Sequence, residues 1–123
     1  MLFYEETRNM SSTALSLFIF LLKGAHEMLE SKFQAGLKKE LREMFPGCII
    51  MKNDPDDTQG IPDLTVLYKD KWATLECKKS ASAKKQPNQE YYVGLMNEMS
   101  FSRFICPENK EDVLDELQQA FKP

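Results

Sequence analysis

Apolar residues recur every three or four positions in three segments of the chain, and this spacing predicts three helices. The first helix starts near Met28 and stops before Pro46-Gly47, a pair that ends helices. The second begins at Pro87, since proline suits a first helical turn, and Asn109 caps the third. The three apolar faces consist of Phe33, Leu37, Leu41 and Met44; of Tyr92, Leu95, Met96 and Met99; and of Val113, Leu114, Leu117 and Phe121.

Short apolar runs between these helices predict four strands, at residues 48–51, 63–68, 72–77 and 101–106. A tight turn around Lys69-Asp70 joins the second strand to the third. The order is therefore helix, three strands, helix, strand, helix. This alternation predicts an α/β fold in which helices flank a small mixed β-sheet of about four strands.

Residues 1–27 form an N-terminal extension to the domain expected at residues 28–123, and the extension includes an apolar run at residues 14–22. A membrane-spanning helix needs roughly twenty apolar residues, so this shorter run predicts no membrane association. We expect an extra N-terminal helix that packs on the domain or on a partner chain. The alternative is that the natural chain starts at Met28 and the residues before it are marginal to the fold.

Charge is distributed unevenly along the 123 residues. The formal net charge of −3 argues against a nucleic-acid-binding protein, because phosphate contacts need lysine and arginine. From Lys69 to Lys85, however, six lysines stand against two acids, Asp70 and Glu76. Such a basic segment beside carboxylates suits an enzyme that holds a polyanion and a cation together.

The three cysteines, Cys48, Cys77 and Cys106, are odd in number and lack any CxxC spacing. This pattern excludes a zinc knuckle and indicates no disulfide framework. Each cysteine lies in an apolar run, so we expect buried free thiols in a reducing compartment, namely the cytoplasm.

Chemistry is concentrated at Asp63 and in the short segment from Glu76 to Lys78. Side chains alternate along a strand, so Glu76 and Lys78 project from the same face. A two-residue turn pairs Tyr68 with Lys71, and counting back from that pair sets Asp63 opposite Glu76. Facing carboxylates repel each other, and a divalent cation between them would compensate. The alternative is that Asp63 ends a strand and that Glu76 and Lys78 form a solvent-exposed pair.

The segments Ile61-Pro62-Asp63 and Glu76-Cys77-Lys78 resemble the signature of the PD-(D/E)XK nuclease superfamily. Gln59-Gly60 and the later Gln89 are similar to its virus-type replication-repair nuclease (VRR-NUC) branch, which includes small phage enzymes and is related in fold to Holliday-junction resolvases. The resemblance covers residues 28–121. It implies a restriction-endonuclease-like core and hydrolysis of DNA that depends on Mg²⁺ or Mn²⁺.

The resemblance also implies a role for each matching residue. Asp63 and Glu76 would bind the metal ion together with the backbone carbonyl of Cys77, and Lys78 would be the catalytic lysine. Gln89 would lie near the site and hydrogen-bond Lys78, a ligand or a phosphate. From the sequence alone, a capping or core-edge role for Gln89 stays open.

The family also carries a glutamate on its first helix, and this chain offers Glu30 and Glu40. Glu30 falls near the middle of the helix's apolar face, where a carboxylate is costly without a partner, and Glu40 falls nearer the edge. We therefore favour Glu30 as the further metal ligand. The alternative is that both glutamates lie at the rim of the face.

The resemblance therefore implies an endonuclease that cuts branched or junction DNA in replication, recombination or repair and leaves a 5′-phosphate. Lys79, Lys84 and Lys85 would follow the DNA backbone. Because the domain is small and the related resolvases are dimers, we expect a homodimer. Two other classes stay open: a non-catalytic module on the same fold that binds nucleic acid or protein, and a small acidic interaction protein without a nucleic-acid role.

Overall fold

The computed structural model describes residues 8–123, so part of the predicted N-terminal extension lies outside the described residues. The predicted α/β class is confirmed, and the strand ends lie within one residue of the predicted ones. In chain order, the elements are α2 (Ser12–Met44), β1 (Ile49–Lys52), β2 (Leu64–Tyr68), β3 (Lys71–Cys77), α3 (Pro87–Met99), β4 (Phe101–Ile105) and α4 (Lys110–Ala120).

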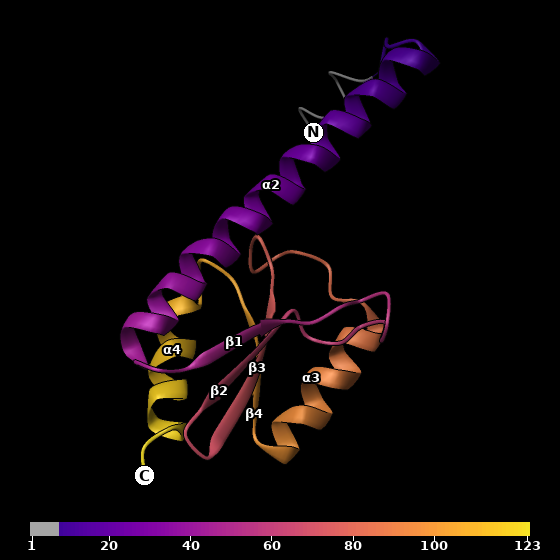
Figure 1. Ribbon diagram of the computed structural model, residues 1–123. Helices are drawn as coiled ribbons and strands as arrows, with labels where there is room; N and C mark the ends of the chain where they lie inside the picture. Colours follow the sequence, from indigo (N-terminus) through magenta and orange to yellow (C-terminus); the bar gives the residue numbers. More distant parts are fainter. Residues whose placement is uncertain (1–7) are drawn as a thin grey trace.

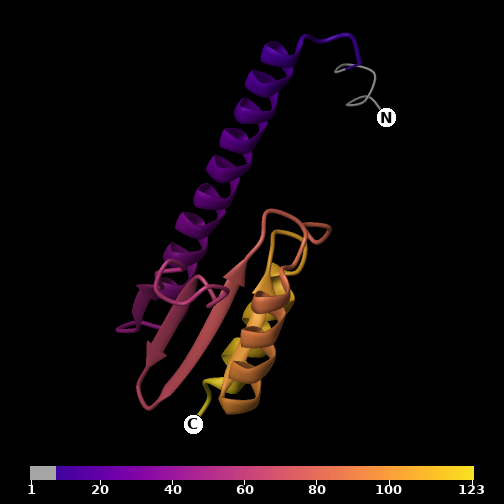
Figure 2. The ribbon, with the colours of Figure 1, turned by 90° about the vertical axis from the view of Figure 1, so that its right-hand side faces the viewer.

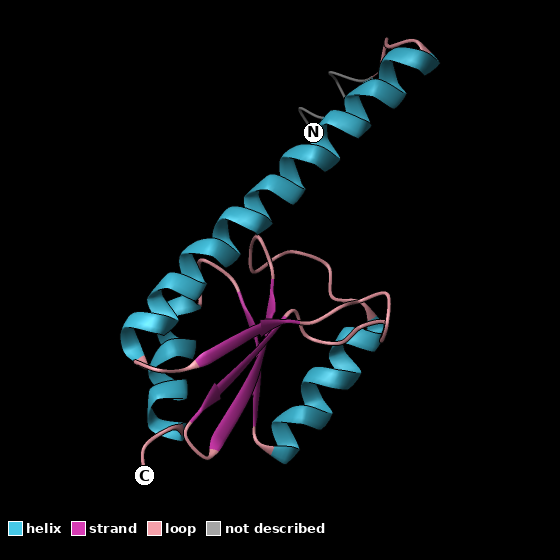
Figure 3. Cartoon of the chain, viewed as in Figure 1, coloured by secondary structure: helices cyan, strands magenta, loops and turns pink. Residues whose placement is uncertain are grey.

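The four strands form one mixed sheet with the order β1-β2-β3-β4 (Figure 3). β1, β2 and β3 are antiparallel neighbours, whereas β3 and β4 are parallel. Parallel neighbours need a crossover connection, and α3 provides it. The predicted small mixed sheet is therefore present.

Helices cover both faces of the sheet (Figures 1 and 2). The C-terminal part of α2 lies with α4 on one face, and α3 lies on the other. Alternate residues of β3 follow this division: Leu75 is buried in the main core, while Thr74 donates a hydrogen bond to the sulfur of Met96 in α3. The main core consists of Leu37, Leu41, Phe45, Leu64, Val66, Ala73, Leu75, Cys77, Phe101, Ile105, Val113, Leu114, Leu117 and Phe121.

The turn between β2 and β3 fixes the register of the two strands. Tyr68 pairs with Lys71, as predicted, so only Lys69 and Asp70 stand between the strands. Lys69 has a φ of 57°, in the left-handed region. A side chain there costs roughly 1 kcal/mol, which the continuous pairing on either side offsets.

α2 is a single helix of 33 residues, about 50 Å long, that leaves the domain over its N-terminal half (Figure 1). No break separates residues 12–27 from the domain helix, so the described part of the predicted extra helix belongs to α2. Several large apolar side chains in the first half of α2 are exposed and therefore not packed on the domain, which was one of the two placements expected. Among residues 8–123, no helix has the length and hydropathy of a membrane span. The most exposed apolar side chains here are Leu17 (58%), Phe20 (70%), Leu21 (59%) and Met28 (75%).

Candidate active site

Asp63 and Glu76 face each other at the end of the hairpin formed by β2 and β3. The last pair of the ladder is Leu64 with Leu75, so the next position on each strand sets Asp63 opposite Glu76. The backbone N–H of Cys77 donates a hydrogen bond of 2.9 Å to Asp63 Oδ2. The predicted juxtaposition of the two acids is therefore present.

Lys78 and Gln89 complete a hydrogen-bonded group around Glu76. Lys78 Nζ donates to Gln89 Oε1 at 2.7 Å, and Gln89 Nε2 donates to Glu76 Oε2 at 3.1 Å. Lys78 Nζ also lies 3.7 Å from the same Glu76 oxygen. Gln89 Oε1 accepts a further bond of 3.0 Å from the backbone N–H of Gln86 at the start of α3. Both roles left open for Gln89, contact with Lys78 and capping of its helix, are therefore combined in one side chain.

Burial distinguishes Glu76 and Lys78 from an ordinary surface pair. Glu76 is 4% exposed and Lys78 is 9% exposed, so the alternative of a solvent-exposed pair is wrong. Removing one partner of a buried pair leaves an uncompensated charge and typically costs about 3–5 kcal/mol. The chain therefore keeps an ion pair where apolar residues would be easier to bury, which is typical of functional sites.

The two carboxyl groups have raised pKa values. Burial is the largest cause for Glu76 and, with the charge of Asp63, raises its pKa from 4.5 to about 8, although the Lys78 ammonium lowers it. Burial also raises the pKa of Asp63, against the hydrogen bond from Cys77 and the charges of Lys78 and Lys52. Adjacent carboxyl groups that resist joint ionisation hold a proton near neutral pH, and a cation can take its place.

Asn53 holds the segment that leads into Asp63. Its side-chain Nδ2 donates to the carbonyl of Pro62 at 2.8 Å and to Thr65 Oγ1 at 2.9 Å, and its backbone N–H donates to the carbonyl of Asp63 at 2.8 Å. Asn53 reads in the sequence as a turn former in a polar loop, so this positioning role was missed. The contacts cross 9 to 12 residues and depend on strand pairing, which no local signal reveals.

Gly60 fixes the approach of the same loop to α3. It has a φ of +87°, and a Cβ atom added to it would lie 2.4 Å from Asn88 Cβ. Only glycine accommodates both the backbone conformation and the close contact. The loop before Asp63 is therefore pressed against the first turn of the helix that carries Gln89.

The two candidate helix glutamates lie in different surroundings. Glu40 Oε2 pairs with Lys110 Nζ of α4 at 2.9 Å. The charge of Glu30 contributes to the raised pKa of Glu76, which places Glu30 near the site. Within residues 8–123, however, no three His, Cys, Asp or Glu residues gather closely enough to hold a metal ion. The direct ligand role of Glu30 stays a prediction.

The lysines expected to follow DNA lie in the connection between β3 and α3. Lys79 Nζ lies 2.8 Å from His26 Nε2, so the middle of α2 contacts this connection. Lys85 Nζ lies 4.6 Å from the centre of the Phe104 ring, while Lys84 is exposed. The sequence assigned no role to His26, which contacts Lys79 in the structure.

The backbone and the side chain of Cys77 lie in different surroundings. Its N–H binds Asp63, while its thiol is 2% exposed in the main core. Burial, together with the charges of Asp63 and Glu76, raises the pKa of the Cys77 thiol, so the sulfur stays protonated. This orientation away from the site was predicted. All three cysteines are free, with Cys77 and Cys106 buried.

Comparison with known proteins adds no relative, since no family model, no curated protein and no solved structure matches this chain.

Proposed function

We propose that this protein is a metal-dependent endonuclease that hydrolyses phosphodiester bonds in branched or junction DNA. The observation that carries the proposal is the facing pair of Asp63 and Glu76, with the buried Lys78 tied to Glu76 through Gln89. Three further features support it: the resemblance to the PD-(D/E)XK signature, the order of elements around a mixed sheet, and the position of Gln89.

The donor set suits Mg²⁺ or Mn²⁺. Mg²⁺ is usually held by one or two carboxylates, with water and substrate phosphate as the remaining ligands. Asp63 and Glu76 supply two carboxyl groups whose joint ionisation is unfavourable without a cation. We propose the Cys77 carbonyl as a further ligand and Glu30 as a partner through water. When bound, the ion would neutralise the scissile phosphate and make a coordinated water more acidic.

Lys78 supplies the positive group of the site. Its ammonium is buried and hydrogen-bonded to Gln89, so its direction is set by the protein before substrate arrives. In this position it orients the attacking water and stabilises charge that develops on the phosphate. Gln89 acts through Lys78 and Glu76 and is a positioning residue.

DNA is the proposed partner, held by the basic segment after β3. Lys79, Lys84 and Lys85 neutralise backbone phosphates on either side of the cut. His26 holds Lys79 against α2, so the helix contributes to the shape of this surface. A 5′-phosphate product follows from the family resemblance.

We further propose a homodimer formed through the projecting part of α2. Leu17, Leu21, Gly24 and Met28 recur at intervals of four, three and four residues, the spacing of a helix–helix seam. A Cβ atom added to Gly24 would meet nothing within 4 Å, so no contact within residues 8–123 explains this glycine in a helix. A second helix at the same seam would bury the leucines and approach closely at Gly24.

The compartment proposed for the protein is the cytoplasm. Its three cysteines are all free, and free thiols persist in a reducing environment.

A non-catalytic nucleic-acid-binding module is the second candidate. The observation that favours it is that no three His, Cys, Asp or Glu residues within residues 8–123 form a group that could hold a metal ion. Such a module would bind DNA with the usual salt dependence and cut none of it.

Cleavage assays on a four-way junction, a flap, a nicked duplex and an intact duplex separate these candidates. We expect Mg²⁺-dependent cutting of a branched substrate, lost in excess EDTA and in Asp63→Asn. Cutting that persists in EDTA would exclude the metal mechanism. Salt-dependent binding without cutting under any metal condition would favour the module, and no binding at all would reject both.

A further inference from the structure

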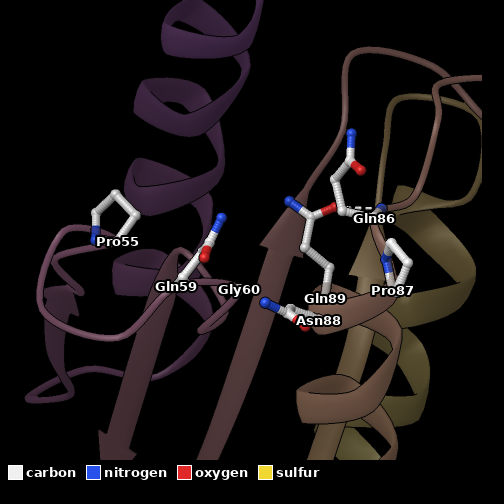
Figure 4. A pocket seen from close by; sticks show the side chains of 7 residues that line it. All are labelled: Pro55, Gln59, Gly60, Gln86, Pro87, Asn88 and Gln89. Carbon is white, nitrogen blue, oxygen red and sulfur yellow. Dashed lines mark hydrogen bonds between the residues drawn. The ribbon is translucent and has the colours of Figure 1, made fainter.

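A pocket of about 390 Å³ lies beside the site, between the loop before β2 and the first turn of α3. Pro55, Gln59 and Gly60 line one side, and residues 86–89 line the other (Figure 4). Its volume falls in the range of pockets that take small organic groups.

The two walls of this pocket are the segments that carry the site. Gly60 precedes Asp63 by three residues, and Gln89 binds both Glu76 and Lys78. The tight contact of Gly60 with Asn88 fixes the distance between the walls. A chemical group bound in the pocket would therefore lie next to a group bound at Asp63 and Glu76.

The chemistry of the lining is neutral and rich in amides. It contains no charged side chain and has two prolines. The side chains of Gln59 and Asn88 make no hydrogen bond within the described residues, and their amides lie at the pocket in Figure 4. A phosphate would call for cationic groups, which the lining lacks. Paired donors and acceptors beside small apolar rings suit a flat neutral group with a polar edge, which is the character of a nucleobase.

We propose that this pocket receives one unpaired nucleobase from the strand that is cut. The inference rests on the proposed function, because it makes DNA the ligand. Gln59 and Asn88 hydrogen-bond the edge of the base, while Pro55 and Pro87 pack against it. A base that is already unpaired enters without the cost of leaving a duplex. The substrate class is therefore DNA with an unpaired nucleotide next to the scissile bond, as at a flap or an open junction.

Binding in Ca²⁺ tests the pocket separately from turnover. A branched oligonucleotide carries 2-aminopurine, or an abasic site, at each position on either side of the junction in turn. We expect one position where 2-aminopurine fluorescence rises on binding and where the abasic site weakens binding about tenfold. The variant with Gln59→Ala and Asn88→Ala should lose this dependence. The matched control carries Gln118→Ala and Gln119→Ala, two exposed amides on α4 across the sheet, and should keep it.

The outcomes separate the pocket from the proposed function. Mg²⁺-dependent cutting with no base dependence at any position would overturn the pocket alone. Base-dependent binding with no cutting would overturn the nuclease and leave the pocket. Absence of DNA binding would overturn both. If the double variant fails to fold, Gln59→Ala tests the same wall from an exposed loop position, and unchanged base dependence there would overturn the assignment.

Discussion

Gln89 Oε1 lies 2.7 Å from Lys78 Nζ, and this bond orients a buried ammonium toward a buried carboxylate. The amide has no freedom to turn, because its nitrogen donates to Glu76 while its oxygen accepts from Lys78. A neutral residue thus holds an ammonium group and a carboxyl group in a fixed arrangement. Preorganisation of this kind is what a transition state with developing charge requires.

Replacing Gln89 tests this positioning role. Gln89→Ala should lower the single-turnover cleavage rate at saturating DNA by about tenfold or more, since Lys78 loses its orienting partner. The double variant with Lys78→Met should cut no more slowly than Lys78→Met alone, because Gln89 acts through Lys78. Multiplied effects in the double variant would show that Gln89 acts independently. Gln119→Ala on α4 serves as the control.

Lys78 itself should differ from the lysines of the connection that follows. Lys78→Met should reduce the single-turnover rate by about a hundredfold, the size of effect seen when one preorganised donor is lost. DNA affinity in Ca²⁺ should change little. Lys84→Met should instead weaken binding and reduce the slope of its salt dependence by about one. If Lys78→Met loses affinity and keeps its rate, Lys78 is one more phosphate-binding lysine.

Glu30 and Glu40 form a matched pair on α2. Glu30→Gln should raise the Mg²⁺ concentration needed for half-maximal cleavage, because the charge of Glu30 is felt at Glu76. Glu40→Gln should leave this concentration unchanged and alter stability by less than about 1 kcal/mol, as expected for its part-exposed pair with Lys110. Metal titrations of both variants decide which glutamate serves the site. A larger rise in the required Mg²⁺ concentration for Glu40→Gln than for Glu30→Gln would assign the role to Glu40.

The sequence was sufficient for the parts of the site that depend on strand alternation. The pairing of Tyr68 with Lys71 followed from a two-residue turn, and it set Asp63 opposite Glu76. These relations hold because the geometry of a strand or helix fixes them over a few residues.

Contacts between distant segments could not be predicted. Asn53 reaches Pro62 and Thr65 only because β1 pairs with β2, and Gly60 meets Asn88 only because the loop folds over α3. The length of α2 was also missed. The apolar run before Met28 and the periodic apolar face after it differ in pattern, so the sequence predicted two helices. The backbone is instead one continuous helix, whose two parts differ in burial.

The projecting part of α2 gives a direct test of the proposed dimer. Leu17→Glu combined with Leu21→Glu should convert a dimer to a monomer in sedimentation velocity, because buried glutamates without partners oppose association. Ser16→Glu changes charge in the same helix and should leave the dimer intact. A wild-type protein that stays monomeric across micromolar concentrations would contradict the proposal.

The raised pKa of Glu76 predicts how stability depends on pH. The folded chain holds its Glu76 proton up to a pKa of about 8, while the unfolded chain releases it near 4.5. Between these values the folded state binds more protons, so the metal-free protein should lose stability as pH rises, by up to about 1.4 kcal/mol per pH unit for one proton.

Glu76→Gln cannot ionise and should flatten this dependence, whereas Glu111→Gln, on the exposed first turn of α4, should not. Mg²⁺ should restore the stability that the wild type loses at pH 8 and should stabilise Glu76→Gln much less, since the amide cannot supply a carboxylate ligand. Urea unfolding of the wild type and both variants at pH 5 and pH 8, with and without Mg²⁺, measures these differences. Equal slopes in wild type and Glu76→Gln would show that Glu76 does not hold the proton.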